Sequence, residues 1–537
     1  MSERAAIEVY DTTLRDGAQQ EGLSLSVADK LAIARHLDDL GVGVIEGGWP
    51  GAIPKDTEFF ARAADELQLR HARLAAFGAT RRAGGRADTD AQVRALLDAR
   101  APVVTLVAKS HTGHVERALR TTPAENLEMV RDSVAFLVAE GREVVLDAEH
   151  FFDGFLLDRA YALEVLRVAM TAGASTVALC DTNGGHLPDV VADVVAEVRA
   201  AVGAPMGIHC HNDTGCAVAN TLAAVDAGAV QVQGTLNGYG ERTGNADLVT
   251  VVANLELKRS TPVLRPGGLA EASRIAHAVS EITNVPPYSR QPYVGASAFT
   301  HKAGLHASAI RVDPDLYQHT DPRTVGNDMR MLVSEMAGRA SIELKGRELG
   351  LDLSDPVLLS AVTEAVKSKE AEGYTFEAAD ASFDLLVRRV AAERGLGEGV
   401  PDYFHVDSWR VITEMRPGDA HGAALSEATV RLVLQGERCV ASGEGNGPVN
   451  ALDAALRTAL DPSYPELAHL DLVDFRVRIL DAAHGTDAVT RVLLETADQE
   501  SSWTTVGVGP NVVEASWEAL VDGLAHGLLR RGVPSRA

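Results

Sequence analysis

Two histidines separated by a single residue are the first feature of the chain with a clear chemical use. His209 and His211 flank Cys210 within an apolar segment that has the pattern of a β-strand. Because side chains alternate along a strand, both imidazoles are expected on one face and Cys210 on the other. Two imidazoles on one face can bind a divalent cation, although two hydrogen-bonded core histidines would give the same pattern. The pair alone leaves both interpretations open.

Two oxygen-bearing side chains extend this pair to a possible metal site. Asp16 follows the first apolar segment of the chain, and Asn245 follows the eighth. In a closed barrel the first and eighth strands are neighbours and the seventh is next, so these two side chains can converge with His209 and His211. Two nitrogen and two oxygen ligands suit Mg²⁺, Mn²⁺ or Zn²⁺, with coordination positions left for a substrate.

Eight strand-helix units in the first half of the chain would position these residues. The expected strands cover residues 7–10, 42–46, 74–77, 103–107, 144–148, 176–180, 206–211 and 230–235, with amphipathic segments such as 26–40, 57–67, 123–140 and 158–172 between them. This rhythm predicts an α/β fold in which residues 1–265 form a (β/α)₈ TIM barrel, with polar residues where the strands end. An open doubly wound sheet is the alternative, and eight evenly spaced units favour closure.

The second half of the chain has a different pattern. Residues 266–400 are expected to form helical linker subdomains, and residues 401–537 a C-terminal α/β regulatory domain. That domain contains an internal repeat, because Gly445-Asn-Gly-Pro448 and Gly507-Val-Gly-Pro510 each follow a hairpin-like segment and precede a helix. Proline suits the first turn of a helix, where its missing N–H has no partner to lose.

Composition excludes several classes of protein. The chain has 537 residues, 46% of them hydrophobic, which predicts several globular domains. With 50 Lys and Arg against 75 Asp and Glu, the net charge is -25, so nucleic-acid binding is not expected. No apolar stretch approaches the roughly 20 residues that a membrane helix needs. Four cysteines without a disulfide spacing, and a polar start without a visible leader, predict a cytoplasmic protein.

Three motifs together resemble the family of isopropylmalate, homocitrate and citramalate synthases. They are Asp11-Thr-Thr-Leu-Arg-Asp-Gly-Ala-Gln19, His209-Cys-His-Asn-Asp213 and Gln233-Gly-Thr-Leu-Asn-Gly-Tyr-Gly-Glu-Arg-Thr-Gly-Asn245. Further stretches, among them Glu46-Gly-Gly-Trp-Pro50 and Asp147-Ala-Glu-His-Phe-Phe-Asp-Gly154, are similar to its citramalate synthase branch. The resemblance implies an acyltransferase that condenses acetyl-CoA with pyruvate to give citramalate and CoA in isoleucine biosynthesis. It also implies a homodimer whose C-terminal domain binds isoleucine as an effector.

The resemblance also implies roles for five further residues. Arg15 would hold the 2-oxo acid and stabilise the oxyanion, although a structural ion pair is the alternative. Thr182 would bind the substrate carboxylate, or would cap a helix instead. Glu149 would stand near the reacting acetyl group as an acid or base, or form a plain salt bridge. His306 and Tyr317, from the region after the barrel, are the candidates for deprotonating the acetyl methyl.

One departure from the citramalate branch leaves the substrate open. The chain reads Lys109-Ser-His-Thr-Gly-His114 where the branch is expected to show Lys-Ser-Trp-Asp-Leu-His. This change could reshape a pocket or could be a neutral loop change. A synthase for a larger 2-oxo acid, giving isopropylmalate or another alkylmalate, is therefore the first alternative. A metal-dependent retro-aldol lyase is a further alternative, which the long C-terminal tail disfavours. A binding protein that has lost catalysis is another, which the intact set of site residues disfavours.

Overall fold

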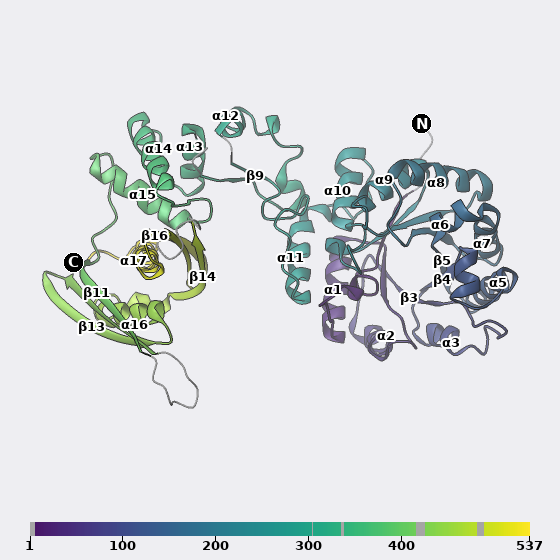
Figure 1. The fold of residues 1–537 in the computed structure, drawn as a ribbon. Coiled ribbons are helices and arrows are strands. Elements are labelled where there is room, and N and C mark those ends of the chain that lie inside the picture. The colour runs from purple at the N-terminus through teal and green to yellow at the C-terminus, as the bar shows by residue number, and fades with distance from the viewer. Residues whose placement is uncertain (1–5, 303, 334–337, 415–424, 481–487, 537) are drawn as a thin grey trace. The chain divides into compact units, whose positions relative to one another are not determined.

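The chain folds into two compact units. The structure, a computed structural model, describes residues 6–302, 304–333, 338–414, 425–480 and 488–536 (Figure 1). The first unit comprises Met1–Phe299 and Thr320–Asp328, and the second comprises Thr300–His319 and Met329–Ala537. Residues 1–5, on which the expectation of a missing leader rests, lie outside the described residues.

Eight parallel strands close into a barrel in the first unit, as the sequence predicted (Figure 1). They are β1 (Glu8–Asp11), β2 (Val44–Gly48), β3 (Arg73–Ala79), β4 (Val103–Lys109), β5 (Glu143–Glu149), β6 (Thr176–Asp181), β7 (Met206–Cys210) and β8 (Gln231–Gly234). Strands β1 and β8 pair directly, with Tyr10 opposite Gln233 and Asp11 opposite Gly234. This closing pair confirms the (β/α)₈ barrel and excludes the open sheet.

Helices surround this barrel. They are α1 (Val27–Leu40), α2 (Pro54–Glu66), α3 (Ala91–Asp98), α4 (Thr112–Arg117), α5 (Pro123–Ala139), α6 (Phe151–Leu157), α7 (Arg159–Thr171), α8 (Pro188–Val202), α9 (Ala217–Ala227), α10 (Leu248–Arg259) and α11 (Ala272–Thr283). Side-chain caps define where two of these helices begin: Ser26 and Asp29 form a capping box at the N-terminus of α1, and Asp158 caps α7. Inside the barrel, one apolar layer consists of Tyr10, Val44, Ala75, Val103 and Val145.

The second unit begins with helices and a short pair of strands. Strands β9 (Thr300–His301) and β10 (Arg330–Met331) pair in parallel, and α12 (Gly304–Val312) follows β9. Helices α13 (Arg339–Glu348), α14 (Pro356–Ala371) and α15 (Asp380–Glu393) come next and share an apolar cluster that includes Ile342, Val362 and Phe383.

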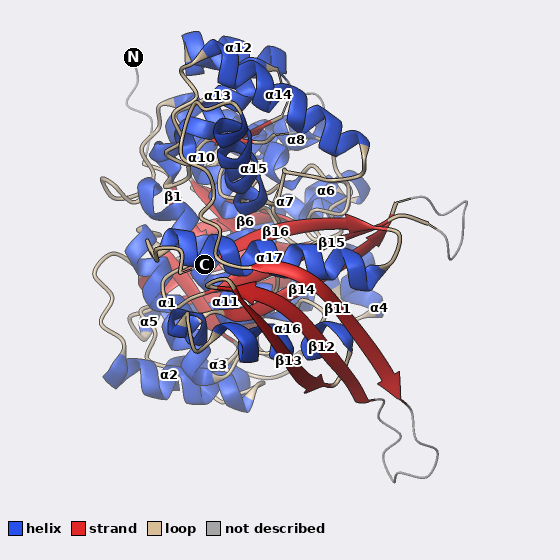
Figure 2. Cartoon of the chain, turned by 90° about the vertical axis from the view of Figure 1, so that its left-hand side faces the viewer, coloured by secondary structure: helices blue, strands red, loops and turns tan. Residues whose placement is uncertain are grey.

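The tail of the second unit contains the expected repeat, and each copy has one strand more than the sequence indicated (Figure 2). The first copy is β11 (His405–Glu414), β12 (Leu425–Leu434), β13 (Glu437–Gly445) and α16 (Pro448–Leu460); the second is β14 (Asp471–Ile479), β15 (Thr490–Ala497), β16 (Ser502–Gly509) and α17 (Val512–Arg530). Each sheet is antiparallel. The motif glycines allow close packing of helix on strand, because a Cβ on Gly507 would collide with the backbone of Ala515.

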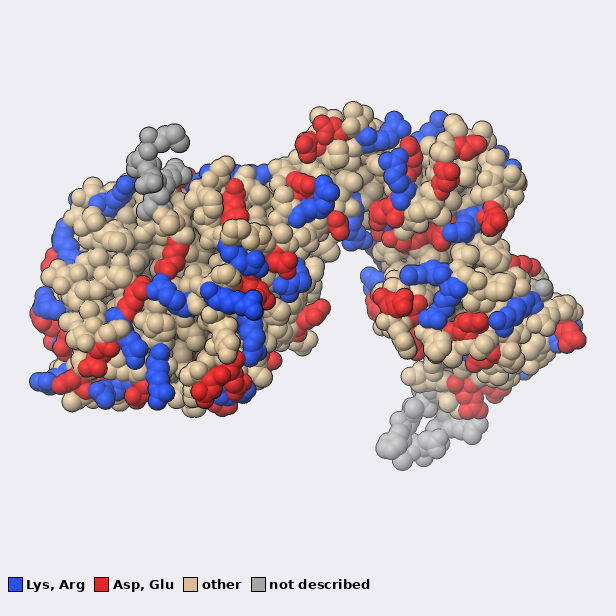
Figure 3. Space-filling view, turned by 180° about the vertical axis from the view of Figure 1, so that it is seen from behind, with Lys and Arg blue, Asp and Glu red and all other residues tan. Residues whose placement is uncertain are grey.

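The surface carries charges of both signs. On the face drawn in Figure 3, Lys and Arg side chains are interspersed with Asp and Glu side chains over both units. Among the described residues, no helix has the length and apolar character needed to cross a membrane.

Candidate functional site

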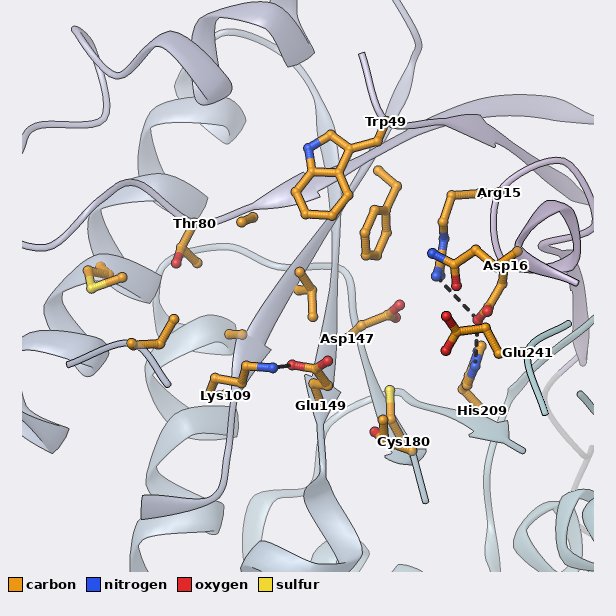
Figure 4. Close-up of a pocket in the computed structure, with 18 of the residues that line it drawn as sticks. Arg15, Asp16, Trp49, Thr80, Lys109, Asp147, Glu149, Cys180, His209 and Glu241 are labelled. Carbon is orange, nitrogen blue, oxygen red and sulfur yellow. Dashed lines mark hydrogen bonds and ion pairs between the residues drawn. The ribbon is translucent and has the colours of Figure 1, made fainter. Parts of the chain in front are cut away.

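A cavity of about 620 Å³ opens at the end of the barrel where the strands finish (Figure 4). Arg15, Asp16 and His209 gather on one side of it, Thr80 and Lys109 lie on the other, and Trp49 lies above. The C-terminal ends of the strands are where barrel enzymes place their chemistry. Six of the predicted site residues line this cavity: Arg15, Asp16, Glu149, Thr182, His209 and His211. Asn245 is not among its described lining residues.

Three of the four predicted metal ligands converge on this cavity. Asp16 Oδ2 lies 3.2 Å from His209 Nε2 and 3.7 Å from His211 Nε2, and the two Nε2 atoms are 3.3 Å apart. All three residues are buried, and their ligand atoms lie within 4.8 Å of one another. His209 belongs to β7, whereas His211 lies just beyond it and forms an isolated β-bridge with Asn245.

Asn245 supplies an independent sign that the site fits a cation. Its Nδ2 donates to the carbonyl of Tyr239 at 3.0 Å, but its buried Oδ1 has no hydrogen-bond partner among the described residues. A buried amide oxygen without a partner is costly unless a ligand satisfies it. One carboxylate, two imidazoles and one free amide oxygen are a donor set that suits Mg²⁺, Mn²⁺ or Zn²⁺.

The electrostatics favour the metal-binding forms of Asp16 and His211. Burial acts to lower the pKa of His209, but the hydrogen bond and the charge of Asp16 raise it. Burial acts to raise the pKa of Asp16, but Arg15, His209 and His211 together lower it far below its usual range. Burial and the charge of His209 lower the pKa of His211 to about 4. Asp16 is therefore an anion and His211 a neutral imidazole, which are the forms that coordinate cations.

Arg15 is held rigidly beside this cluster. Its Nε donates to Glu46 Oε1 at 2.5 Å, its Nη1 lies 3.2 Å from Asp16 Oδ2, and its guanidinium lies 3.9 Å above the ring of Phe77. Glu46 in turn accepts a hydrogen bond from the Tyr10 hydroxyl at 2.9 Å. The ion pair that the sequence left as an alternative is thus present, and it aims the guanidinium at the cavity that Arg15 lines (Figure 4).

Thr182 and Glu149 also line the cavity, with defined partners. Thr182 Oγ1 accepts from the His150 N–H at 2.8 Å, and α8 begins only at Pro188, so the alternative of a helix cap at Thr182 is wrong. Glu149 forms an ion pair with Lys109 across the ends of β5 and β4. The salt bridge that the sequence allowed for Glu149 is therefore present at the cavity wall.

His306 and Tyr317 lie in the second compact unit. Their rings stack on each other, with centroids 4.1 Å apart and planes at 30°, and Tyr317 is 40% exposed. The structure brings these two residues together, and their action on a substrate in the barrel stays a prediction.

Two residues at the cavity were quoted in motifs by the sequence analysis but were given no role there. Asp147 lies between Arg15 and Glu149 (Figure 4), and burial raises its pKa to about 6, with a further contribution from the charge of Glu46. The signal was available, because Asp147 stands two residues before Glu149 on β5 and so shares its face. Trp49 is the second, with its ring edge-on to Phe77 at 5.2 Å.

The loop that departs from the citramalate branch lies beside the cavity. Lys109 lines the cavity, whereas His111 and Thr112 are absent from the described residues of its wall. His114 stacks on the ring of His150, with centroids 3.9 Å apart, and meets His111 edge-on. Of the substituted residues, His111 therefore adds an edge-on contact to the stacked rings of His114 and His150, and neither it nor Thr112 is among the described residues of the cavity wall.

Three protein families match successive parts of the chain. Residues 6–276 match the HMGL-like family, residues 293–373 the homocitrate synthase post-HMGL domain-like family, and residues 377–528 the LeuA allosteric (dimerisation) domain. The chain belongs to the HMGL-like family of enzymes, whose match spans the barrel and its site.

Full-length relatives narrow the assignment. The chain is 63% identical to an (R)-citramalate synthase of Streptomyces coelicolor and 46% identical to one of Aquifex aeolicus, in each case over 98% of both chains. A probable 2-isopropylmalate synthase of Methanopyrus kandleri is 34% identical over 98% of this chain and 99% of that protein. Within its family the chain is thus a transferase of the citramalate synthase group.

Proposed function

We propose that the chain condenses the acetyl group of acetyl-CoA with pyruvate to give citramalate and CoA. The observation that carries this proposal is the 63% identity to an (R)-citramalate synthase over 98% of both chains. Loss of a methyl proton from acetyl-CoA gives an enolate, whose carbon forms a bond to the keto carbon of pyruvate. Water then cleaves the thioester of citramalyl-CoA and releases CoA as the thiol.

Asp16, His209, His211 and Asn245 are proposed to hold one divalent ion, Mg²⁺, Mn²⁺ or Zn²⁺. The converging ligand atoms and the unpartnered Asn245 Oδ1 support this assignment. When bound, such an ion polarises the keto group of the 2-oxo acid. Arg15, adjacent to Asp16, then faces the oxygen on which negative charge develops and stabilises it.

The remaining site residues orient the substrate and move protons. Thr182 Oγ1 accepts from a backbone N–H, so its own hydroxyl proton is free to be donated to the carboxylate of the 2-oxo acid. Glu149 is proposed as an acid-base group near the acetyl moiety. His306 and Tyr317, stacked on each other, are proposed to supply the base that removes the methyl proton.

Release of the CoA thiol tests the proposed reaction. The purified chain is supplied with acetyl-CoA, a divalent ion and either pyruvate, 2-oxobutyrate or 2-oxoisovalerate at equal concentration, and the product is identified by mass spectrometry. Pyruvate should give the fastest release, with citramalate as product. Faster release with 2-oxoisovalerate would support the isopropylmalate alternative instead. Protein carrying His209→Ala, which lacks one proposed metal ligand, measures the background of the assay.

The C-terminal domain is proposed to bind isoleucine and to join two chains as a homodimer. The match of residues 377–528 to the LeuA allosteric (dimerisation) domain supports both parts. Strand β14 supports the second, because every other residue from Val473 to Ile479 is apolar and exposed, by 55% at Val473 and 57% at Ile479. An apolar row of this kind marks an interaction surface, and a second copy of the chain would cover it.

The oligomeric state tests this surface. Light scattering on the parent chain should give twice the mass of one chain, and Val477→Asp should shift the chain toward the monomer. Arg476→Lys is the control on the same strand and should leave the dimer intact, because it keeps the positive charge beside Asp474. We also infer a cytoplasmic location, which the four free cysteines support.

A further inference from the structure

A buried chain of side-chain amides leads from the far end of the barrel to His209. Gln231 and Gln233, both on β8, are 2% and 0% exposed. Gln231 Nε2 donates to Glu8 Oε2 at 2.9 Å, and Gln233 Nε2 donates to Gln231 Oε1 at 3.1 Å. Gln233 Nε2 also donates to Asp147 Oδ1 at 3.0 Å, and Gln233 Oε1 lies 3.0 Å from His209 Nδ1.

The partners of this chain fix the direction of every hydrogen bond in it. The carboxylate of Glu8, paired with Arg73 at 2.7 Å, only accepts, so Gln231 must turn its NH₂ group toward Glu8 and its oxygen toward Gln233. Gln233 must then turn its NH₂ group toward Gln231 and Asp147. Its oxygen is left to face His209.

The protonation of one ring nitrogen follows from this direction. A carbonyl oxygen only accepts hydrogen bonds, so the Nδ1 atom of His209 must carry a proton. Nε2 of the same ring is the atom that faces Asp16 Oδ2 and His211 Nε2. Nε2 is therefore the nitrogen that can offer a lone pair to a cation.

We propose that Gln233 is a positioning residue that holds His209 with Nδ1 protonated and Nε2 directed at the metal cluster, and that Gln231 and Glu8 set the orientation of the Gln233 amide. The proposal rests on the metal site assigned above. Gln233, Gln231 and Glu8 are not metal ligands in this proposal, and they act on the metal site only through His209.

The expected effect of losing Gln233 is a loss of metal affinity. Methionine in its place would fill the same volume without a comparable acceptor, so the buried Nδ1–H of His209 would lose its partner and the ring could rotate or change tautomer. Partners of this kind are worth about 10-fold to 100-fold in metal affinity or activity. Replacement of a buried glutamine that has no hydrogen bond to His209 should leave the metal affinity unchanged.

Cobalt titration of the metal-stripped full-length chain tests the proposal. The dissociation constant for Co²⁺ is measured from its visible absorption spectrum in the parent and in Gln233→Met, where it should rise by about 10-fold to 100-fold. Gln291→Met is the matched control: Gln291 is also a buried glutamine of the first unit, but its amide bonds Asn237 and Asp247. That variant should keep the parent dissociation constant within twofold. Thermal melting of both variants separates a change in affinity from a change in stability.

Two further variants make each outcome decisive. Gln231→Met removes the acceptor that orients Gln233 and should raise the dissociation constant for Co²⁺ by at least threefold. If Gln233→Met does not fold, this variant tests the role of Gln233 in its place. A rise of less than threefold in Gln233→Met, or in Gln231→Met where only that variant folds, would overturn the proposal. His209→Ala should abolish the spectrum of the site. If it did not, the metal assignment itself would be wrong, which is a different failure from that of the Gln233 role.

Discussion

Replacement of Arg15 by lysine is the most informative single change at the site, because it keeps the charge and removes the geometry. The guanidinium of Arg15 has Glu46 Oε1 at 2.5 Å and Asp16 Oδ2 at 3.2 Å, and it stacks over Phe77. Its planar fork contacts both carboxylates and still has N–H groups left for a substrate oxygen. A lysine ammonium is one compact charge on a flexible stem.

The magnitude follows from how a lysine would settle in this pocket. Its ammonium would lie between the carboxylates of Glu46 and Asp16, the two strongest acceptors within reach, and would have no rigid donor left for the developing oxyanion. Loss of one such donor typically lowers kcat by about 10²-fold to 10³-fold, or about 2.7 to 4 kcal/mol of transition-state stabilisation. Since the buried carboxylates keep a cationic partner, the melting temperature should change far less than kcat.

Steady-state kinetics with pyruvate and acetyl-CoA measure the effect. Arg15→Lys should lower kcat and kcat/KM together, which is the mark of an interaction made in the transition state. Arg62→Lys is the control, because Arg62 pairs with Glu66 on the exposed face of α2 and both side chains are about 40% exposed. A kcat for Arg15→Lys within fivefold of the parent would refute the proposed role.

Three other changes test separate parts of the proposals. His209→Ala should abolish turnover while far-UV circular dichroism stays that of the parent, and near-normal activity in metal-stripped buffer would exclude His209 as a ligand. Burial raises the pKa of Asp11 to about 7, so its ionisation destabilises the folded state by up to about 4 kcal/mol as pH rises from about 4 to 7. The melting temperature of Asp11→Asn should therefore rise relative to that of the parent over this pH range. A difference in melting temperature that does not change with pH would contradict the raised pKa. The isoleucine carboxylate is proposed to bind the first N–H groups of α16, which no side chain caps. Gly447→Asp should place a carboxylate on those N–H groups and weaken isoleucine inhibition at unchanged basal activity. Asn511→Asp, at the already capped start of α17, is its control, and equal inhibition in both variants would place the effector elsewhere.

The barrel could be predicted from the sequence because its strands are buried on both faces. Short apolar runs such as residues 103–107 and 176–180 stand out between amphipathic helices, and the structure places β4 and β6 there. His209 and Asp16 could be placed together for the same reason, since barrel closure fixes which strand ends are neighbours. The sequence could therefore predict which side chains lie close together wherever this depends only on the order of the strands.

Strands β11 and β14 were missed by the sequence analysis, and neither has a fully buried face within one chain. In β14 every residue except Leu472 is exposed, and β11 is largely exposed as well. The alternation that indicates a strand was nevertheless present in β14, where four apolar residues alternate with charged ones from Val473 to Ile479. The same apolar row, which is exposed in one chain, supports the assignment of β14 as a surface between two chains.

The direction of an amide cannot be read from a sequence either. Gln233 appears there only as one letter of a motif, and its role depends on which end of its side chain faces His209. That end is decided by Glu8, which lies at the start of another strand. Positioning residues of this kind are set by a network of partners, so they become visible only when the partners have coordinates.

The balance of buried charge explains why this site should require a cation. The buried carboxylates of Asp16, Glu46 and Asp147 lie in the barrel near the guanidinium of Arg15, while Glu149 is paired with Lys109. Negative charge is costly in a buried site: burial, and after it the charge of Glu46, raise the pKa of Asp147. A 2-oxo acid is itself an anion, so these carboxylates would repel it. A divalent ion held by the proposed ligands would supply positive charge that offsets these carboxylates, and Arg15 would add a cationic contact for the anionic substrate.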